Sequence, residues 1–169
     1  MILWLGAVLL GAAWSGAGAS VELPVPVIRQ APERCGPAAL AMVLRFYGAD
    51  SARTAAAGAA HDPALRGSLI TDLAACARRA GFDARVATLT EDSLRALLRA
   101  GVPPVLLYRR GFGPITRGHY GVVVGWEADR RRFRLHDGGR VPRAIGHRDL
   151  MRRWEAAGCQ ALIVEPPRP

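Results

Sequence analysis

The sequence contains no lysine, so all 23 basic residues are arginine, against 14 acidic residues and a net charge of +9. Such an excess of positive charge usually points to a nucleic acid or another anionic surface as partner. Here the lack of lysine, with many alanines, glycines and prolines, is typical of a GC-rich genome, so the net charge is weaker evidence for an anionic partner. Aromatic residues are only 7% of the chain and do not alternate with the arginines as a base-stacking platform requires. We therefore expect no nucleic acid partner.

Long apolar runs are absent after the first residues. Residues 1–13 are apolar and small residues follow, with an A-x-A pattern at 17–19. This run is short for a membrane span, and the pattern fits a signal peptidase site. We predict a signal peptide over residues 1–19, a mature chain that starts at Ser20, and export to the periplasm or the extracellular space. No basic residue precedes the run, so either the signal is atypical or the true start lies upstream. An uncleaved anchor is the alternative to a cleaved signal.

Cysteine is scarce, and its number is odd: Cys35, Cys76 and Cys159. In an oxidising compartment three cysteines leave at least one free thiol. Cys76 shares the apolar face of its expected helix with Leu69 and Leu73, which predicts a core position. Whether Cys76 and Cys159 form a disulfide stays open at this point.

The remaining pattern is that of one α+β domain over residues 20–169. Half of the 169 residues are apolar, which suffices for one core. Hydrophobic spacing and capping residues predict helices and strands, the helices over 35–47, 69–80, 90–100 and 147–157, and the strands over 83–87, 104–108, 119–126, 132–137 and 160–164. Residues 50–68 have a weak helical signal, and residues 111–117 are expected to form a Gly/Pro loop. Helices come first and a mainly antiparallel sheet second, which favours an α+β fold.

Cys35 is the first candidate for chemistry, because it starts an apolar helix just before Gly36 and Pro37. The positive end of the helix dipole and the unpaired backbone N–H groups there favour a thiolate. The sequence therefore predicts a nucleophile at this position. A buried structural cysteine is the alternative.

A thiolate nucleophile needs a base and a group that orients the base. His119 opens one expected strand and Asp137 closes the next. A hairpin centred at residue 128 places the two opposite each other, with Cβ atoms about 5 Å apart, whereas a slip of one residue would separate them. Gln30, five residues before Cys35, can donate its amide to an oxyanion, although an ordinary polar residue ending a strand is the alternative. His61, His136 and His147 are expected to lie outside the site.

Three segments together resemble cysteine peptidase family 39: Gln30-x4-Cys35-Gly-Pro-Ala-Ala-Leu-Ala-Met-Val-Leu, Gly118-His-Tyr-Gly-Val-Val-Val-Gly125 and Leu135-His-Asp137. This family comprises papain-like peptidases typified by those that cut bacteriocin leader peptides after a double glycine. The resemblance spans residues 23–165 and implies a papain-like fold that uses no metal or cofactor. It further implies Cys35 as nucleophile, His119 as base, Asp137 as its orienter and Gln30 as oxyanion donor, acting on a peptide or protein substrate.

Two departures from the family bear on specificity. The transporter-linked members often have Asp-Pro where this chain has Asp137-Gly138-Gly139, and they carry membrane and ATPase domains. We therefore expect a stand-alone, exported, monomeric member whose cleavage preference the resemblance does not supply. Arginines between 130 and 153 suggest association with an anionic envelope surface. The alternatives are a catalytically silent papain-like module that binds peptides, and another papain-like amidase or acyltransferase.

Overall fold

The computed structural model describes residues 19–112 and 115–167. The predicted signal peptide lies outside these residues except for Ala19. The helices are α1 (Cys35–Phe46), α2 (Ser51–Ala56), the 3₁₀ helix η1 (Ala57–Ala60), α3 (Ile70–Arg79), α4 (Glu91–Arg99) and α5 (His147–Glu155). The strands are β1 (Val21–Glu22), β2 (Asp83–Thr88), β3 (Val105–Phe112), β4 (Ile115–Glu127), β5 (Arg132–His136), β6 (Arg143–Gly146) and β7 (Gln160–Glu165).

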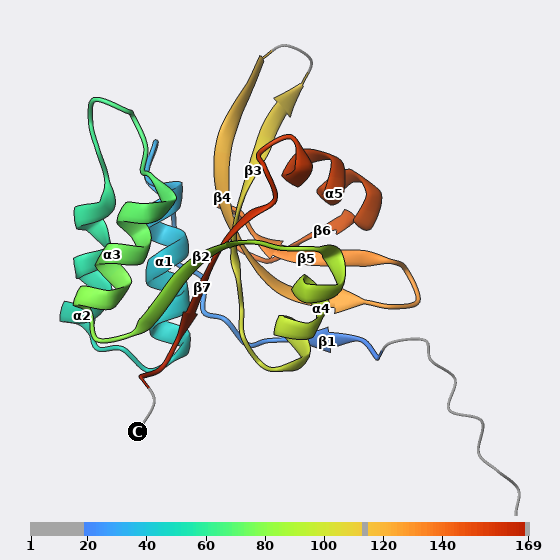
Figure 1. Cartoon of the computed structure of the whole chain (residues 1–169), viewed down its shortest axis with the longest axis horizontal. Helices are drawn as coiled ribbons and strands as arrows, with labels where there is room; N and C mark the ends of the chain where they lie inside the picture. The colour runs from blue at the N-terminus through green and yellow to red at the C-terminus, as the bar shows by residue number, and fades with distance from the viewer. Residues whose placement is uncertain (1–18, 113–114, 168–169) are drawn as a thin grey trace, which may run out of the picture.

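The strands form one antiparallel sheet in the order β2-β7-β3-β4-β5-β6, with β1 paired to β4. In Figure 1, α1, α2 and α3 gather on one side of the strongly twisted sheet, whereas α4 and α5 lie on the other side. The α+β architecture predicted from the sequence is therefore confirmed.

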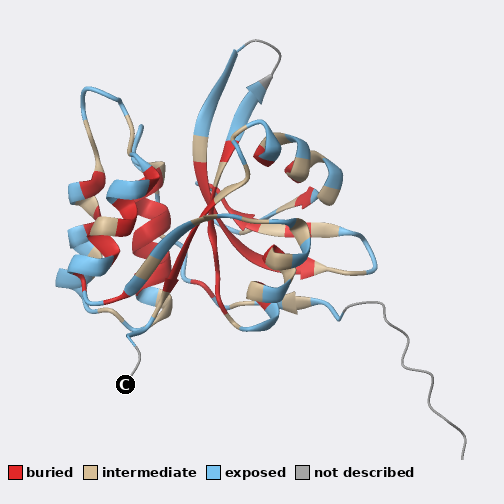
Figure 2. Ribbon diagram, viewed as in Figure 1, coloured by how far each residue is buried: buried red, intermediate tan, exposed pale blue. Residues whose placement is uncertain are grey.

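Helices on both sides of the sheet bury both faces of its central strand. Every residue of β4 from Tyr120 to Trp126 is buried (Figure 2). One hydrophobic cluster joins α1 and α3 to residues such as Val122, and a second joins α4 and α5 to residues such as Phe133. Helix α1 is itself buried from residue 36 to residue 44, so it is a central helix rather than an amphipathic surface helix. The start of this helix is thus packed into the core beside the sheet.

The prediction of a loop over residues 111–117 is wrong. Strand β3 continues to Phe112 and β4 begins at Ile115, so the two form a long hairpin that projects from the sheet (Figure 1). Glycine and proline near its tip suggested a longer loop than the turn requires. The weak helical signal after residue 50 corresponds to α2 and η1, where Asp50 caps α2 by accepting a hydrogen bond of 2.8 Å from the backbone N–H of Arg53.

The predicted register of the β4–β5 hairpin is also wrong. Val122 pairs with His136, and the pairing shifts at an irregularity between Val123 and Gly125. Continued past the end of β5, this register places Asp137 opposite Gly121 rather than opposite His119. The turn is centred between residues 129 and 130 instead of at residue 128, which displaces the pairing by three residues, and the bulge after Val123 takes one of them back. At the His119 end the net displacement is two residues, so the two side chains keep the same face.

The cysteines are all free, so Cys76 and Cys159 form no disulfide. Cys76 is 2% exposed, and its predicted core position is confirmed. Leu69 was expected to share that buried face, but it is 52% exposed because it is the N-cap of α3 and lines a surface hollow.

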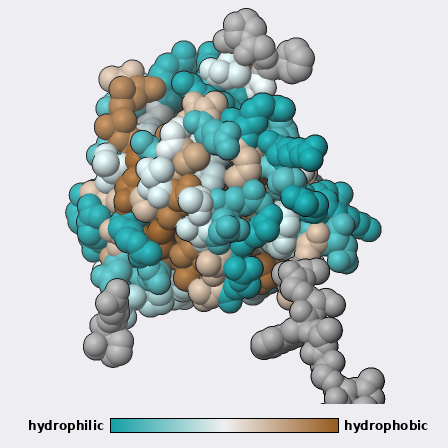
Figure 3. Space-filling model, turned by 45° about the vertical axis from the view of Figure 1, so that its right-hand side comes forward, coloured by the Kyte–Doolittle hydropathy of each residue, from teal (hydrophilic) through white to brown (hydrophobic). Residues whose placement is uncertain are grey.

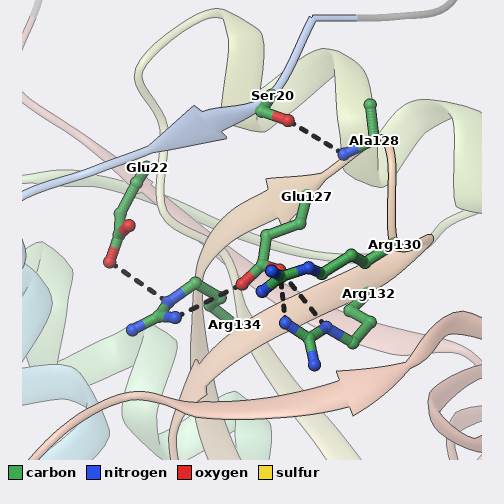
Figure 4. A network of polar contacts seen from close by, with 7 residues as sticks. All are labelled: Ser20, Glu22, Glu127, Ala128, Arg130, Arg132 and Arg134. Carbon is green, nitrogen blue, oxygen red and sulfur yellow. Dashed lines mark hydrogen bonds and ion pairs between the residues drawn. The ribbon is translucent and has the colours of Figure 1, made fainter.

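The arginines at the β4–β5 turn are largely engaged in ion pairs. Glu127 pairs with Arg130, Arg132 and Arg134, and Arg134 also reaches Glu22 on β1 (Figure 4). The backbone N–H of Ala128 donates to Ser20 Oγ at 2.9 Å, which fixes the beginning of the described chain to this turn. In Figure 3, where this side of the molecule is turned forward, hydrophilic residues predominate on the right and hydrophobic residues form a narrow strip left of centre.

Within residues 19–112 and 115–167, no helix combines the length and the apolar character that crossing a membrane requires.

Candidate active site

Cys35 lies where two surface hollows meet. The His119 hollow, about 900 Å³, is lined by Gln30, Cys35, His119 and Asp137 among others. The Tyr120 hollow, about 750 Å³, is lined by Cys35 and Tyr120 and by part of the loop before α3. Arg66, Arg117 and Gly118 line both hollows, as does Cys35. The two hollows therefore adjoin as one cleft, with the thiol at their junction.

Close packing at the start of α1 sets the position of Cys35. A Cβ added to Gly36 would lie 3.1 Å from the Cβ of Ser68, so a larger residue there would push the helix away from its neighbour. Pro37 occupies the first turn, where a missing N–H costs nothing. Cys35 is half-buried, and the first backbone N–H groups of the helix have no partner within it.

Gln30 presents an unused donor beside this helix start. Its Nε2 is buried and has no hydrogen-bond partner among the described residues. A buried donor without a partner costs about 1–3 kcal/mol, which is the kind of cost that proteins retain at functional sites. Its Oε1 lies 2.9 Å from where a Cβ of Gly138 would be, and Gly138 has a φ of +107°. Proline cannot adopt that φ, so a glycine at position 138, and not a proline, is compatible with this position of Gln30.

His119 is oriented by a backbone carbonyl instead of a carboxylate. Its Nε2 lies 3.1 Å from the carbonyl oxygen of Asp137 and 3.2 Å from Nη1 of Arg110. The two contacts compete, because Nε2 must carry a hydrogen to donate to the carbonyl and must be unprotonated to accept from Arg110. The ring also packs edge-on against Tyr108, with 5.5 Å between ring centroids.

The surroundings of His119 favour its neutral form. Burial lowers the pKa of His119 to about 4, and the charge of Arg110 acts in the same direction. The Asp137 carbonyl and carboxylate oppose this change without cancelling it. At neutral pH the imidazole is therefore uncharged, as a general base must be.

The carboxylate of Asp137 is held by residues that the sequence analysis did not identify. It is 5% exposed and accepts hydrogen bonds from Nε of Arg143 at 2.9 Å and from the Tyr108 hydroxyl at 3.3 Å. Burial, with the nearby Asp137 charge, raises the pKa of Tyr108, so this hydroxyl remains a donor. Arg110 donates to the Asp137 carbonyl oxygen at 2.8 Å. Tyr108 and Arg110 are two positions apart on β3 and therefore share one face of the strand. Only the register between β3 and β4 brings that face to His119.

The structure brings together Gln30, Cys35, His119 and Asp137, whereas the other three histidines do not line the cleft. His136 is buried, and its Nε2 lies 2.9 Å from the carbonyl of Val25. Among the described residues, no three histidine, cysteine or acidic side chains are grouped so that they could hold a metal ion.

Comparison with known proteins gives a match to one family model. The family model described as the Peptidase_C39 like family matches residues 22–162. No curated protein sequence gives a significant match.

Three solved structures are similar in fold. A double glycine motif protease from an AMS/PCAT transporter, in complex with the leader peptide, has 21% sequence identity and a TM-score of 0.68, over 87% of this chain and 95% of that chain. The peptidase domain of Streptococcus ComA, a bi-functional ABC transporter of a quorum sensing pathway, has 19% identity and a TM-score of 0.68, over 85% and 99%. A candidate C39-like peptidase from Bacillus anthracis has 17% identity and a TM-score of 0.73, over 89% and 100%.

Proposed function

The chain belongs to the Peptidase_C39 like family, and from this premise we propose that it is a cysteine peptidase with Cys35 as its nucleophile. One observation carries the proposal: Cys35, His119 and the unpaired amide of Gln30 line the same hollow. A thiol, a neutral imidazole and a free donor are the groups that acyl transfer through a thioester requires.

The proposed reaction has two stages. The Cys35 thiol gives its proton to His119, and the sulfur attacks the carbonyl carbon of the scissile peptide bond. The oxyanion accepts hydrogen bonds from Gln30 Nε2 and from the backbone N–H of Cys35. The C–N bond then breaks, His119 protonates the leaving amine, and a thioester remains. Water attacks this thioester with His119 as base, which releases the acid and restores the thiol.

The contact between His119 and the Asp137 carbonyl suits this role. When Nε2 carries the hydrogen and donates it to that carbonyl, the lone pair of the neutral ring is on Nδ1. That nitrogen is then the one able to take a proton from Cys35. Asp137 would thus orient the base through its backbone, while Arg143 and Tyr108 hold the loop in place through the carboxylate.

We also propose that the protein is an exported and monomeric enzyme that acts on peptides. The signal-like residues 1–19 support export. The similar double glycine motif protease that binds a leader peptide supports a peptide substrate. At 21% identity the double-glycine specificity is not carried over.

A second candidate is a silent module that binds peptides in the same cleft. The contact between Arg110 and His119 favours it, since the nearby positive charge opposes the imidazolium that catalysis forms. In the described part of the chain, no hydrogen bond joins Cys35 to His119. A module that binds peptides without cutting them would not need such a bond.

Incubation with a proteome-derived peptide library, read by mass spectrometry, separates the two candidates. The wild-type protein is expected to cut peptides, and Cys35→Ala is expected to cut none while unfolding at the same temperature. Cys159→Ser, which alters a thiol outside the cleft, serves as the matched control and should retain activity. Cutting by Cys35→Ala would overturn the proposal, and a folded wild-type protein that cuts nothing would favour the silent module.

A further inference from the structure

The two halves of the cleft differ in their charge. The His119 hollow is lined by four arginines and by two carboxylates, Glu33 and Asp137, and each carboxylate is paired with one of the arginines. The Tyr120 hollow is lined by Arg66, Arg109 and Arg117 and by no acidic residue. Apart from Arg66, which pairs with Glu33 of the adjoining hollow, the arginines of this half therefore have no acidic residue in its walls to compensate their charge.

Two of these arginines lack a carboxylate partner. Arg109 and Arg117 lie on the projecting β3–β4 hairpin, both are exposed, and neither forms an ion pair with any residue that the structure describes. Arg117 is also directly opposite Arg110 across the two strands. Like charges at directly opposed positions destabilise a strand pair. Arg110 lines only the His119 hollow, whereas Arg117 lines both hollows, so the charge of Arg117 stands at the junction of the two.

The opposite wall adds a third arginine. Arg66 is 70% exposed, has a φ of +51°, and pairs through Nε with Glu33 Oε1 at 2.6 Å. Glu33 also has a positive φ, at +63°. Non-glycine residues in this conformation are strained, and such strain is concentrated at binding and catalytic sites. Leu65 and Leu69 are exposed beside Arg66 and give this wall an apolar rim.

The chemistry of the proposed reaction assigns a direction to the cleft. The leaving amine takes its proton from His119, so the leaving-group side of the substrate lies in the His119 hollow. The acyl side must then extend past Cys35 in the other direction, into the Tyr120 hollow. The part of the substrate on the amino-terminal side of the cut is therefore the part that meets Arg66, Arg109 and Arg117.

We propose, on the basis of the peptidase function above, that the protein selects acidic peptides. The Tyr120 hollow binds the acyl-side segment of the substrate through a glutamate or aspartate side chain, which Arg109 contacts from the hairpin and Arg66 from the opposite wall, while Arg117 adds its charge at the junction with the His119 hollow. These arginines are specificity-determining residues and take no part in bond cleavage.

Two matched peptide libraries test the proposal without requiring turnover. Both are random at every position except one, which holds glutamate in the first library and glutamine in the second, and the fixed position is moved along the peptide. Each library is passed over immobilised Cys35→Ala protein, and the retained peptides are counted by mass spectrometry. Retention of glutamate peptides is expected to exceed that of glutamine peptides about tenfold at low salt, the effect of one charged hydrogen bond.

A charge-matched pair of variants separates the cleft from the general basicity of the protein. In Arg109→Gln/Arg117→Gln the excess should fall to about twofold or less. In Arg99→Gln/Arg148→Gln, which loses the same charge from exposed arginines of α4 and α5, the excess should persist. Equal retention of the two libraries, or an excess that both double variants lose equally, would overturn the proposal.

The same libraries incubated with the wild-type protein test the peptidase function separately. A charge preference in binding without any cutting would contradict the proposed function and leave the acidic selectivity standing. Cutting of both libraries at equal rates would support the peptidase function and contradict the acidic selectivity.

Discussion

The imidazole of His119 meets Asp137 at its backbone: Nε2 lies 3.1 Å from the carbonyl oxygen of Asp137, whose carboxylate pairs with Arg143 instead. The backbone carbonyl is present whichever residue occupies position 137, whereas the carboxylate is present only when that residue is acidic. The relationship therefore divides the work of Asp137 between its backbone, which contacts the base, and its side chain, which anchors the loop through Arg143 and Tyr108.

This division predicts unequal effects at the two positions. His119→Ala removes the proposed base and should lower kcat at least about a hundredfold, within the range for general base catalysis. Asp137→Ala should cost less in kcat, because the carbonyl that orients the ring remains. Steady-state kinetics on a peptide cut by the wild-type protein measure both. An Asp137→Ala variant as inactive as His119→Ala, yet equally well folded, would contradict the division.

The buried histidine also predicts how stability depends on pH. In the folded chain the pKa of His119 is about 4, against an ordinary value of 6.5. Between these values the unfolded chain binds a proton that the folded chain does not, so folding is favoured above pH 6.5 and stability is lost as pH falls towards 4. The loss amounts to about 3 kcal/mol.

Urea unfolding at a series of pH values measures this loss. His119→Gln, which keeps a polar side chain but no titrating group, should show a flatter profile between pH 6.5 and 4 than the wild-type protein. Parallel profiles for the two proteins over that interval would mean that His119 does not cause the loss.

The positive charge of Arg110 should disfavour protonation of His119 to the imidazolium. Replacement by glutamine removes a positive charge 3.2 Å from Nε2, so the pKa of His119 should rise from about 4 towards 6.5. NMR titration of the His119 ring measures the change directly. Arg109→Gln is the neighbouring control, because its side chain belongs to the opposite face of β3. An unchanged titration in Arg110→Gln would show that burial alone keeps the ring neutral.

Gln30→Ala should reduce catalysis without unfolding the protein. Its Nε2 has no hydrogen-bond partner among the described residues, so its loss leaves no protein group unsatisfied. If the amide stabilises the oxyanion, kcat should fall about a hundred- to a thousandfold with KM nearly unchanged. A rise in KM at constant kcat would instead indicate a contact with the ground-state substrate.

The sequence by itself determined the features that depend on local chemistry. The apolar run after Cys35, with Pro37 in its first turn, predicts a helix that starts at the thiol, and α1 begins at that residue. Thr90 predicts an N-cap, and its side chain accepts from the backbone N–H of Ser93. The α+β fold follows from the order of such elements, because spacing and caps are recorded within a few residues of one another.

Tertiary structure alone decided how the candidate site is completed. The position of the β4–β5 turn and the bulge after Val123 together set the hairpin register, since alternation fixes which face a side chain takes but not its partner across the sheet. Arg110 reaches His119 only because β3 and β4 pair in one register, and Arg143 reaches Asp137 from β6, which local pattern did not reveal. Contacts between residues distant in sequence depend on pairing and packing, and these are properties of the whole folded chain.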